Sequence, residues 1–240
     1  MLHQWSLQQI CAKLLCEDGL SVSHESLYCH IWKDKKQGGM LYTHLRQRGK
    51  KRNKRGSAKA GRGLIPNRVD ISERPAIVDT KTRVGDWELD SIIGAKHQGA
   101  ITSMVERKTK LTRLVLVEGT RAKDTSDAII ARLEPLKQHV LTLTSDNGKE
   151  FANHEKISKT LDAPFYFCTP YHSWERGLNE NTNGLVRQYF PKRMDFSTLT
   201  QADVQRVENL LNNRPRKILN YHSPNKVFHN LTAKQPALCT

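Results

Sequence analysis

The stretch GDWELDSI, residues 85–92, decides the fold together with LTLTSDNGKEF, residues 141–151. A strand alternates its side chains with a period of two, so the three acidic residues of the first stretch share one face, with Asp90 the last of them. The second stretch is a short β-branched, apolar run that stops at Asp146, where an Asn-Gly pair turns the backbone. Both stretches are therefore predicted to be strands that each deliver an aspartate.

Working outward from these strands gives the fold class. Three strands joined by short turns, followed by alternating helices and strands, predict an α/β protein with a mixed five-stranded sheet and helices on its faces. The predicted strands cover residues 85–93, 100–106, 112–117, 140–144 and 164–168, and the predicted helices cover 122–137 and 154–161. A further amphipathic helix over 200–213 is expected to pack on this core.

A third carboxylate lies in WERGLNENTNGLVRQYFPK, residues 174–192. If this segment is a helix, Glu180, Asn183, Gly184 and Arg187 share one face of it. Three acids delivered by two strands and a helix would suit two hard cations such as Mg²⁺, which activate an attacking oxygen and stabilise a leaving oxygen in phosphoryl transfer. The alternative is that each acid is an ordinary exposed surface residue.

A resemblance to a known family favours the first of these interpretations. The strings WELD and SDNGKEF, with 33 residues between Asp146 and Glu180, resemble the DDE signature of retroviral integrases and insertion-sequence transposases. PNRVDISERPAIVD, GDWELD, DNGKEF, WERGLNENTNGLVRQYFPK and LNNRPRK are similar to the bacterial transposase family named after insertion sequence thirty. These strings lie between residues 64 and 228, in the same order as the motifs of that family.

The resemblance implies a ribonuclease H-like core with Asp90, Asp146 and Glu180 as catalytic triad and metal ligands. Asp86 and Glu88 are neighbours on the same strand face, and Asp90 is preferred because it ends the WxxD string. The implied cofactor is a pair of Mg²⁺ ions, for which Mn²⁺ can substitute. The implied reaction is cleavage of double-stranded DNA at transposon ends and transfer to target DNA by a homodimer or higher assembly.

The net charge of +15 also indicates a nucleic-acid partner. Residues 35–69 contain twelve Lys and Arg and no Asp or Glu, so they contribute +12 and the rest of the chain only +3. With little apolar material to bury, residues 46–75 are predicted to be a flexible basic linker that binds phosphates without sequence preference. A solvated or localisation-like tract is the alternative. The candidate phosphate-binding residues are Lys50, Lys51, Arg52, Lys54 and Arg55 in the linker, and Arg176, Arg187 and Lys192 near the third acid.

Residues 5–36 are predicted to form two short helices separated by a turn at Gly19. Ser23 is the expected N-cap of the second helix, whose first residues, His24 and Ser26, would approach base edges if the pair is a helix-turn-helix. A plain αα-hairpin is the alternative. The apolar positions are Leu7, Ile10, Ala12, Leu14 and Leu15 in the first helix, and Leu27, Tyr28, Ile31 and Trp32 in the second.

The family resemblance implies that this pair is the second of two DNA-binding modules. The chain begins too late to contain the first, so we expect weak recognition of transposon ends. Five cysteines without a C-x₂-C pair argue against a disulfide scaffold and suit a reducing cytosol. A zinc site from Cys11, Cys16, His24 and His30 has the wrong ligand order and spacing.

The sequence thus predicts a helical DNA-binding segment over residues 1–45, a linker over 46–75 and a catalytic core over 76–240. No segment has the length of a membrane span or the pattern of a signal peptide, which favours a cytoplasmic, nucleoid-associated bacterial protein. The leading function is a DNA transposase. The alternatives are a ribonuclease H-like nuclease that does not join strands, and a truncated, non-catalytic DNA-binding regulator of transposition.

Overall fold

The computed structural model describes residues 5–45, 65–169 and 177–233. The chain divides into two compact units, which we describe separately. One comprises Met1–Ala60 and Asn213–Ser223, and the other comprises Gly61–Asn212 and Pro224–Thr240. The candidate linker residues Lys50, Lys51, Arg52, Lys54 and Arg55, and Arg176 near the third acid, lie outside the described residues.

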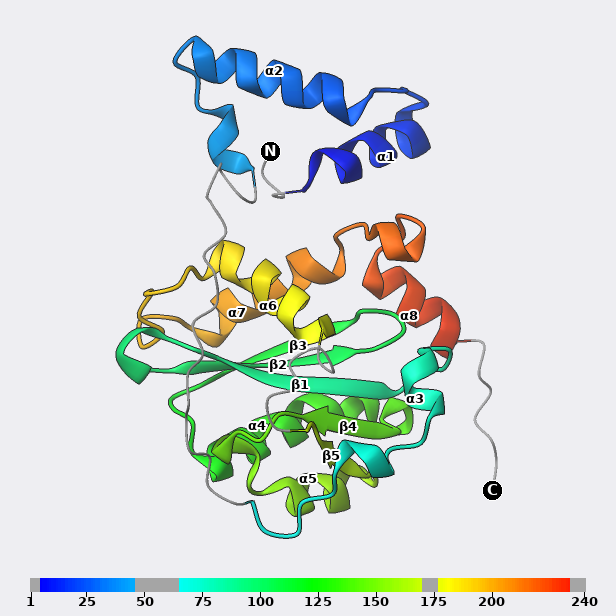
Figure 1. Cartoon of the computed structure of the whole chain (residues 1–240), viewed down its shortest axis with the longest axis vertical. Helices are drawn as coiled ribbons and strands as arrows, with labels where there is room; N and C mark the ends of the chain where they lie inside the picture. Colours follow the sequence, from blue (N-terminus) through cyan, green and yellow to red (C-terminus); the bar gives the residue numbers. More distant parts are fainter. Residues whose placement is uncertain (1–4, 46–64, 170–176, 234–240) are drawn as a thin grey trace. The chain divides into compact units, whose positions relative to one another are not determined.

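The larger unit is built on a five-stranded sheet (Figure 1). Its strand order is β3-β2-β1-β4-β5, in which β1 to β3 pair antiparallel and β4 joins β1 and β5 in parallel. This order confirms the predicted mixed five-stranded sheet and agrees with the core that the family resemblance implies. The strands are β1 (Asp86–Ile93), β2 (Ala100–Glu106), β3 (Thr112–Val117), β4 (Thr142–Ser145) and β5 (Phe165–Phe167).

Helices cover both faces of the sheet (Figure 1). Trp87 and Leu89 point from β1 into a buried cluster shared with α4 and α5, whereas Ile92 points into a second cluster shared with α6 and α7. The alternation predicted for β1 is therefore confirmed, and its acids lie on the α6/α7 face. The helices are α3 (Ile77–Thr80), α4 (Ala122–Leu133), α5 (His154–Leu161), α6 (Gly177–Tyr189), α7 (Gln201–Asn212) and α8 (Pro224–Thr232).

The smaller unit contains the two predicted N-terminal helices, α1 (Leu7–Asp18) and α2 (His24–Lys36). Ser6 and Gln9 form a capping box at the start of α1, and Gly19 ends the helix with a φ of 66°, which a residue with a side chain rarely adopts. Ser23 caps α2 by accepting a hydrogen bond from the backbone N–H of Glu25 at 3.1 Å, as predicted.

Burial in this small unit is sparse. Of the apolar positions predicted for the two helices, Leu7 and Ile31 are buried, whereas Leu15, Tyr28 and Trp32 are exposed. A second segment of chain completes the unit, because Gln9 accepts a hydrogen bond from Arg214 Nε at 2.9 Å and donates one to the carbonyl of Pro215 at 2.5 Å. Across the described residues, no helix has both the length and the apolar character needed to cross a bilayer.

Candidate active site

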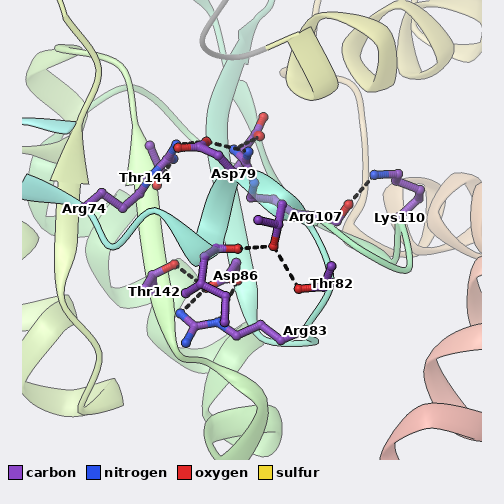
Figure 2. A network of polar contacts seen from close by, with 12 residues as sticks. Arg74, Asp79, Thr82, Arg83, Asp86, Arg107, Lys110, Thr142 and Thr144 are labelled. Carbon is purple, nitrogen blue, oxygen red and sulfur yellow. Dashed lines mark hydrogen bonds and ion pairs between the residues drawn. The ribbon is translucent and has the colours of Figure 1, made fainter. Parts of the chain in front are cut away.

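The acids of β1 differ sharply in their surroundings. Asp86 is fully buried, and its carboxylate accepts hydrogen bonds from Arg83 at 2.9 and 3.0 Å and from Thr142 at 2.8 Å (Figure 2). Glu88 is also buried and accepts a hydrogen bond from Arg107 Nη1 at 2.6 Å. Asp90, by contrast, is only half-buried. Of the three, it is the acid whose carboxylate solvent can reach.

Burial raises the pKa of the Glu88 carboxyl, and the Arg107 guanidinium opposes that rise. A buried acid whose carboxylate accepts hydrogen bonds from a guanidinium has little access to solvent or substrate. Asp86 and Glu88 therefore have structural partners that account for them, which supports the preference for Asp90 as the candidate catalytic acid of this strand.

The parallel β1–β4 pairing ends at Glu88 and Thr144, two residues before Asp90 and Asp146. Asp86 pairs with Thr142 and Glu88 with Thr144, so the next position on the same face of each strand is Asp90 on β1 and Asp146 just beyond β4. Continued for two more residues, the spacing of about 4.8 Å between neighbouring strands predicts that these two half-buried acids lie close together.

The turn after β4 holds Asp146 in place. The backbone N–H of Gly148 donates to Asp146 Oδ1 at 3.0 Å, which is the local hydrogen bond that makes aspartate a turn residue. Asn147 is buried and donates to the carbonyl of Cys168 at 2.7 Å, and the Cys168 N–H donates to the Ser145 carbonyl at 2.9 Å. The Asp-Asn-Gly turn is therefore fixed against the residue that follows β5.

Glu180 lies in the first turn of α6. One asparagine before it and one after it attach this helix to β1. Asn179 donates to the carbonyl of Leu89 at 3.1 Å, and Asn183 donates to Asp90 Oδ2 at 2.7 Å. Glu180 itself is exposed. The helix that carries Glu180 is thus fixed to the strand that carries Asp90, and Asn183, one residue of the predicted helical face, makes one of the two contacts.

The same helical stripe continues to Arg187. Its Nη2 donates to the carbonyl of Ile93 at 2.8 Å, its guanidinium lies 5.5 Å from the centre of the Phe196 ring, and burial lowers its pKa. Arg187 therefore has contacts within the core. Lys192, which follows α6, is exposed.

In the smaller unit, Ser26 is exposed in the first turn of α2. His24 is half-buried, with its ring edge-on to Tyr28. Both candidate base-reading residues therefore lie at the N-terminal end of α2, where they were predicted.

Several residues around the candidate acids were missed from the sequence. Asn179 was not singled out, although it shares a helical stripe with the named residues Asn183 and Arg187 at positions i, i+4 and i+8, and this spacing could have indicated the contact with β1. Ser103 donates to Asn183 Oδ1 at 3.0 Å and Arg107 binds Glu88, but both come from β2 or its end, and no local pattern indicates them.

The donor set suits a hard divalent cation. Carboxylate oxygens are the ligands that Mg²⁺ takes, usually one or two per ion, with water and substrate phosphate completing the octahedron. Asp90 and Asp146 are half-buried rather than sealed, as such a site requires. Within the part of the chain that the structure describes, no three His, Cys, Asp or Glu side chains are gathered closely enough to hold an ion by themselves.

Comparisons with known proteins identify transposases as relatives of this chain. The chain is 50% identical to the transposase of insertion sequence element IS4351 from Bacteroides fragilis, over 93% of this chain and 69% of that protein. It is 38% identical to the IS1086 transposase from Cupriavidus metallidurans, over 96% and 70%, and 33% identical to the IS30A transposase InsI from Escherichia coli, over 94% and 61%. The catalytic core domain of BIV integrase aligns in structure with a TM-score of 0.49 and 22% identity, over 64% of this chain and all of that one. No family model matches the chain.

The ribonuclease H-like sheet and the transposase relatives define an enzyme of the polynucleotidyl transferase type. The chain belongs to the family of insertion-sequence transposases that includes those of IS4351, IS1086 and IS30.

Proposed function

We propose that this transposase cleaves DNA at the ends of an insertion sequence and joins the resulting 3′-hydroxyl to target DNA. The observation that supports the proposal is the β1–β4 register, which ends with Glu88 opposite Thr144, each two residues before one of the proposed aspartates, Asp90 and Asp146. The attachment of α6 to β1 by Asn179 and Asn183 supports Glu180 as the third acid, because Glu180 lies between these two residues on the helix. Water and a 3′-hydroxyl are equivalent in-line nucleophiles, so one site serves both steps.

Asp90, Asp146 and Glu180 would hold two divalent cations, Mg²⁺ by preference with Mn²⁺ able to substitute. When bound, these ions polarise the scissile phosphate and activate the attacking oxygen. Other residues of the chain orient these acids. Asn183 orients the Asp90 carboxylate, and the Gly148 N–H orients that of Asp146. No nucleophilic side chain is needed for this chemistry.

Double-stranded DNA is the proposed partner, in the form of both transposon ends and target. The basic residues from Lys50 to Arg55, together with Arg176 and Lys192, would bind phosphates, while His24 and Ser26 would contact bases from a helix-turn-helix. Concerted cleavage of two ends requires at least a homodimer on DNA. The substrate implies that the protein acts at the nucleoid, in the bacterial cytoplasm.

The test replaces each acid by its amide, as Asp90→Asn, Asp146→Asn and Glu180→Gln. Each change removes a cation ligand without removing a phosphate contact, so cleavage and joining of labelled end DNA in Mg²⁺ should fall by at least about 100-fold while DNA affinity stays near that of the wild type. Asp162→Asn is the matched control, because Asp162 is exposed and its left-handed φ of 55° suits asparagine.

Wild-type cleavage by any one of the three variants would remove that acid from the site. Nicked DNA without a joined product from the unmodified protein would instead identify a nuclease that hydrolyses only. DNA binding without either product would identify a non-catalytic regulator.

A further inference from the structure

Two buried arginines meet on the sheet face that carries the candidate acids. The side chains of Arg74 and Arg107 are 3% and 4% exposed, and their Nη2 atoms both donate to Asp79 Oδ1, at 2.5 and 3.2 Å. Arg74 lies just before α3, Asp79 lies within α3, and Arg107 follows β2 (Figure 2). Two arginines from outside β1 and β4 thus meet at one aspartate of α3.

The remaining donors of the two arginines reach two different strands. Arg74 Nη1 donates to Thr144 Oγ1 on β4 at 3.1 Å, and Arg107 Nη1 donates to Glu88 Oε1 on β1 at 2.6 Å. Thr144 and Glu88 are register partners. The chain of contacts Glu88–Arg107–Asp79–Arg74–Thr144, which we call the bracket, therefore spans the β1–β4 pair from one strand to the other.

The bracket lies directly behind the proposed metal ligands. Two residues on from Glu88 is Asp90 and two residues on from Thr144 is Asp146, each on the same face of its strand. A rise of about 3.3 Å per residue puts each aspartate about 7 Å further along its strand than the bracket. The distance between the two carboxylates, and their offset along the strands, therefore depend on how β1 and β4 are held together at the bracket.

Stability alone is a weak explanation of so much buried charge. Taking ions out of water costs several kcal/mol for each ion, and apolar side chains of similar volume commonly stabilise a fold as well or better. A guanidinium, however, is planar and presents donors in a fixed fork, so it fixes the relative positions of the groups it bridges. Both arginines use this fork, because each donates from Nη1 to a strand and from Nη2 to Asp79.

We propose that Arg74, Asp79 and Arg107, acting through Glu88 and Thr144, are positioning residues that set the separation of the Asp90 and Asp146 carboxylates for divalent-cation binding. The inference rests on the proposed function of those two aspartates. None of the bracket residues is a ligand, and each acts through the backbone of β1 or β4.

A second cross-strand contact provides a matched control. Arg83 binds Asp86 on β1, and Asp86 also accepts from its register partner Thr142 on β4. This contact uses the same chemistry between the same strands but lies one same-face position further from the aspartates. Arg83→Lys therefore changes a comparable ion pair while leaving the bracket intact.

The experiment measures Mn²⁺ binding to the full chain by calorimetric titration, without DNA. Arg107→Lys keeps the charge but loses the fork, and Asp79→Asn weakens the hub of the bracket. Both should raise the dissociation constant for Mn²⁺ by about 10-fold or more, the range typical of residues that orient metal ligands. Arg83→Lys should stay within about twofold of the wild type on the same reasoning. Because the Asp79 side chain is 64% exposed, Asp79→Asn carries the test if Arg107→Lys fails to fold.

The Asp90→Asn/Asp146→Asn double variant separates the two proposals. If it binds Mn²⁺ as the wild type does, the metal site itself is misassigned. If it loses Mn²⁺ binding while Asp79→Asn and Arg107→Lys bind normally, with or without a lower melting temperature, the acids are correct and the bracket has only a structural role, which overturns the inference.

Discussion

At the scale of single residues, the candidate site depends on one amide. Asn183 donates to Asp90 Oδ2 at 2.7 Å, while its own oxygen accepts from Ser103 Oγ at 3.0 Å. The second contact fixes which way the amide points, because Ser103 supplies a hydroxyl donor to the oxygen. The Asp90 carboxylate is therefore held by α6 and, through Ser103, by β2.

Asn183→Ala should loosen this carboxylate without disturbing the core. We expect turnover to fall and the Mg²⁺ concentration for half-maximal activity to rise, each by about 10- to 100-fold, because an orienting neighbour of a metal ligand is lost. Asn181→Ala, an exposed change on the same helix, is the control. An unchanged Mg²⁺ requirement in Asn183→Ala would exclude the orienting role.

Among the secondary-structure elements, α7 is attached to β3 by polar side chains, namely the buried carboxylate of Glu208 and the amides of Asn212 and Gln201. Glu208 is fully buried and accepts hydrogen bonds from Arg113 at 2.9 Å, from the Leu114 backbone N–H at 2.7 Å and from Arg132 at 2.6 Å. These donors lie on β3 and α4, so one side chain joins three elements.

Glu208→Ala should lower the free energy of unfolding by about 3 kcal/mol, since it leaves two arginines without their counter-charge. The arginines are partly exposed, so we expect the lower end of the usual range for a broken buried ion pair. Chemical denaturation measures this quantity, and Glu134→Ala, at an exposed position, should change it by less than about 0.5 kcal/mol. A loss as small as that of the control would show that the Glu208 carboxylate does not contribute to holding α7 on the sheet.

Local patterns predicted most of these elements closely. The strands over 100–106 and 112–117 and the helix over 154–161 match β2, β3 and α5 residue for residue, because alternation and helical spacing there coincide with burial. The predicted helix over 122–137 is too long as an α-helix. α4 ends at Leu133, and Pro135 lies in a 3-10 helix that follows, because proline cannot donate the hydrogen bond that continues an α-helix.

Such local patterns could not predict contacts between segments that are distant in the sequence. β4 was predicted two residues early, because its start is fixed by pairing of Thr142 with Asp86, 56 residues away. The bracket likewise joins Arg74 to Thr144 across 70 residues. The three acids were identified from motif and order, whereas the reason to prefer Asp90 over Glu88 became physical only when the partner of Glu88 was known.

For the molecule as a whole, we expect the basic linker, residues 46–75, to contribute to DNA affinity and not to the catalytic step. Neutralising Lys50, Lys51, Arg52, Lys54 and Arg55 should weaken binding to all duplexes alike. It should also make the slope of log affinity against log salt shallower by up to about 4.5, since each lost phosphate contact removes about 0.9. The control neutralises five exposed cations of the catalytic unit, namely Arg121, Lys123, Lys137, Lys159 and Lys226. Equal slopes for the two variants would rule out the linker as the main phosphate-binding element.

The same binding assay tests the N-terminal helices. Replacing His24 and Ser26 should leave the salt slope nearly unchanged and reduce the preference for end DNA over random duplex, because base contacts carry specificity and phosphate contacts do not. If the preference is unaffected, the pair of helices is an αα-hairpin without a base-reading role.

Anomalous diffraction from crystals soaked in Mn²⁺ would show whether Asp90, Asp146 and Glu180 form one cation site. We expect an anomalous peak within coordination distance, roughly 2.0–2.3 Å, of carboxylate oxygens from both Asp90 and Asp146, and its loss in Asp90→Asn. A peak bound only by other acids, or one at Asp90 that persists in Asp146→Asn, would contradict this expectation.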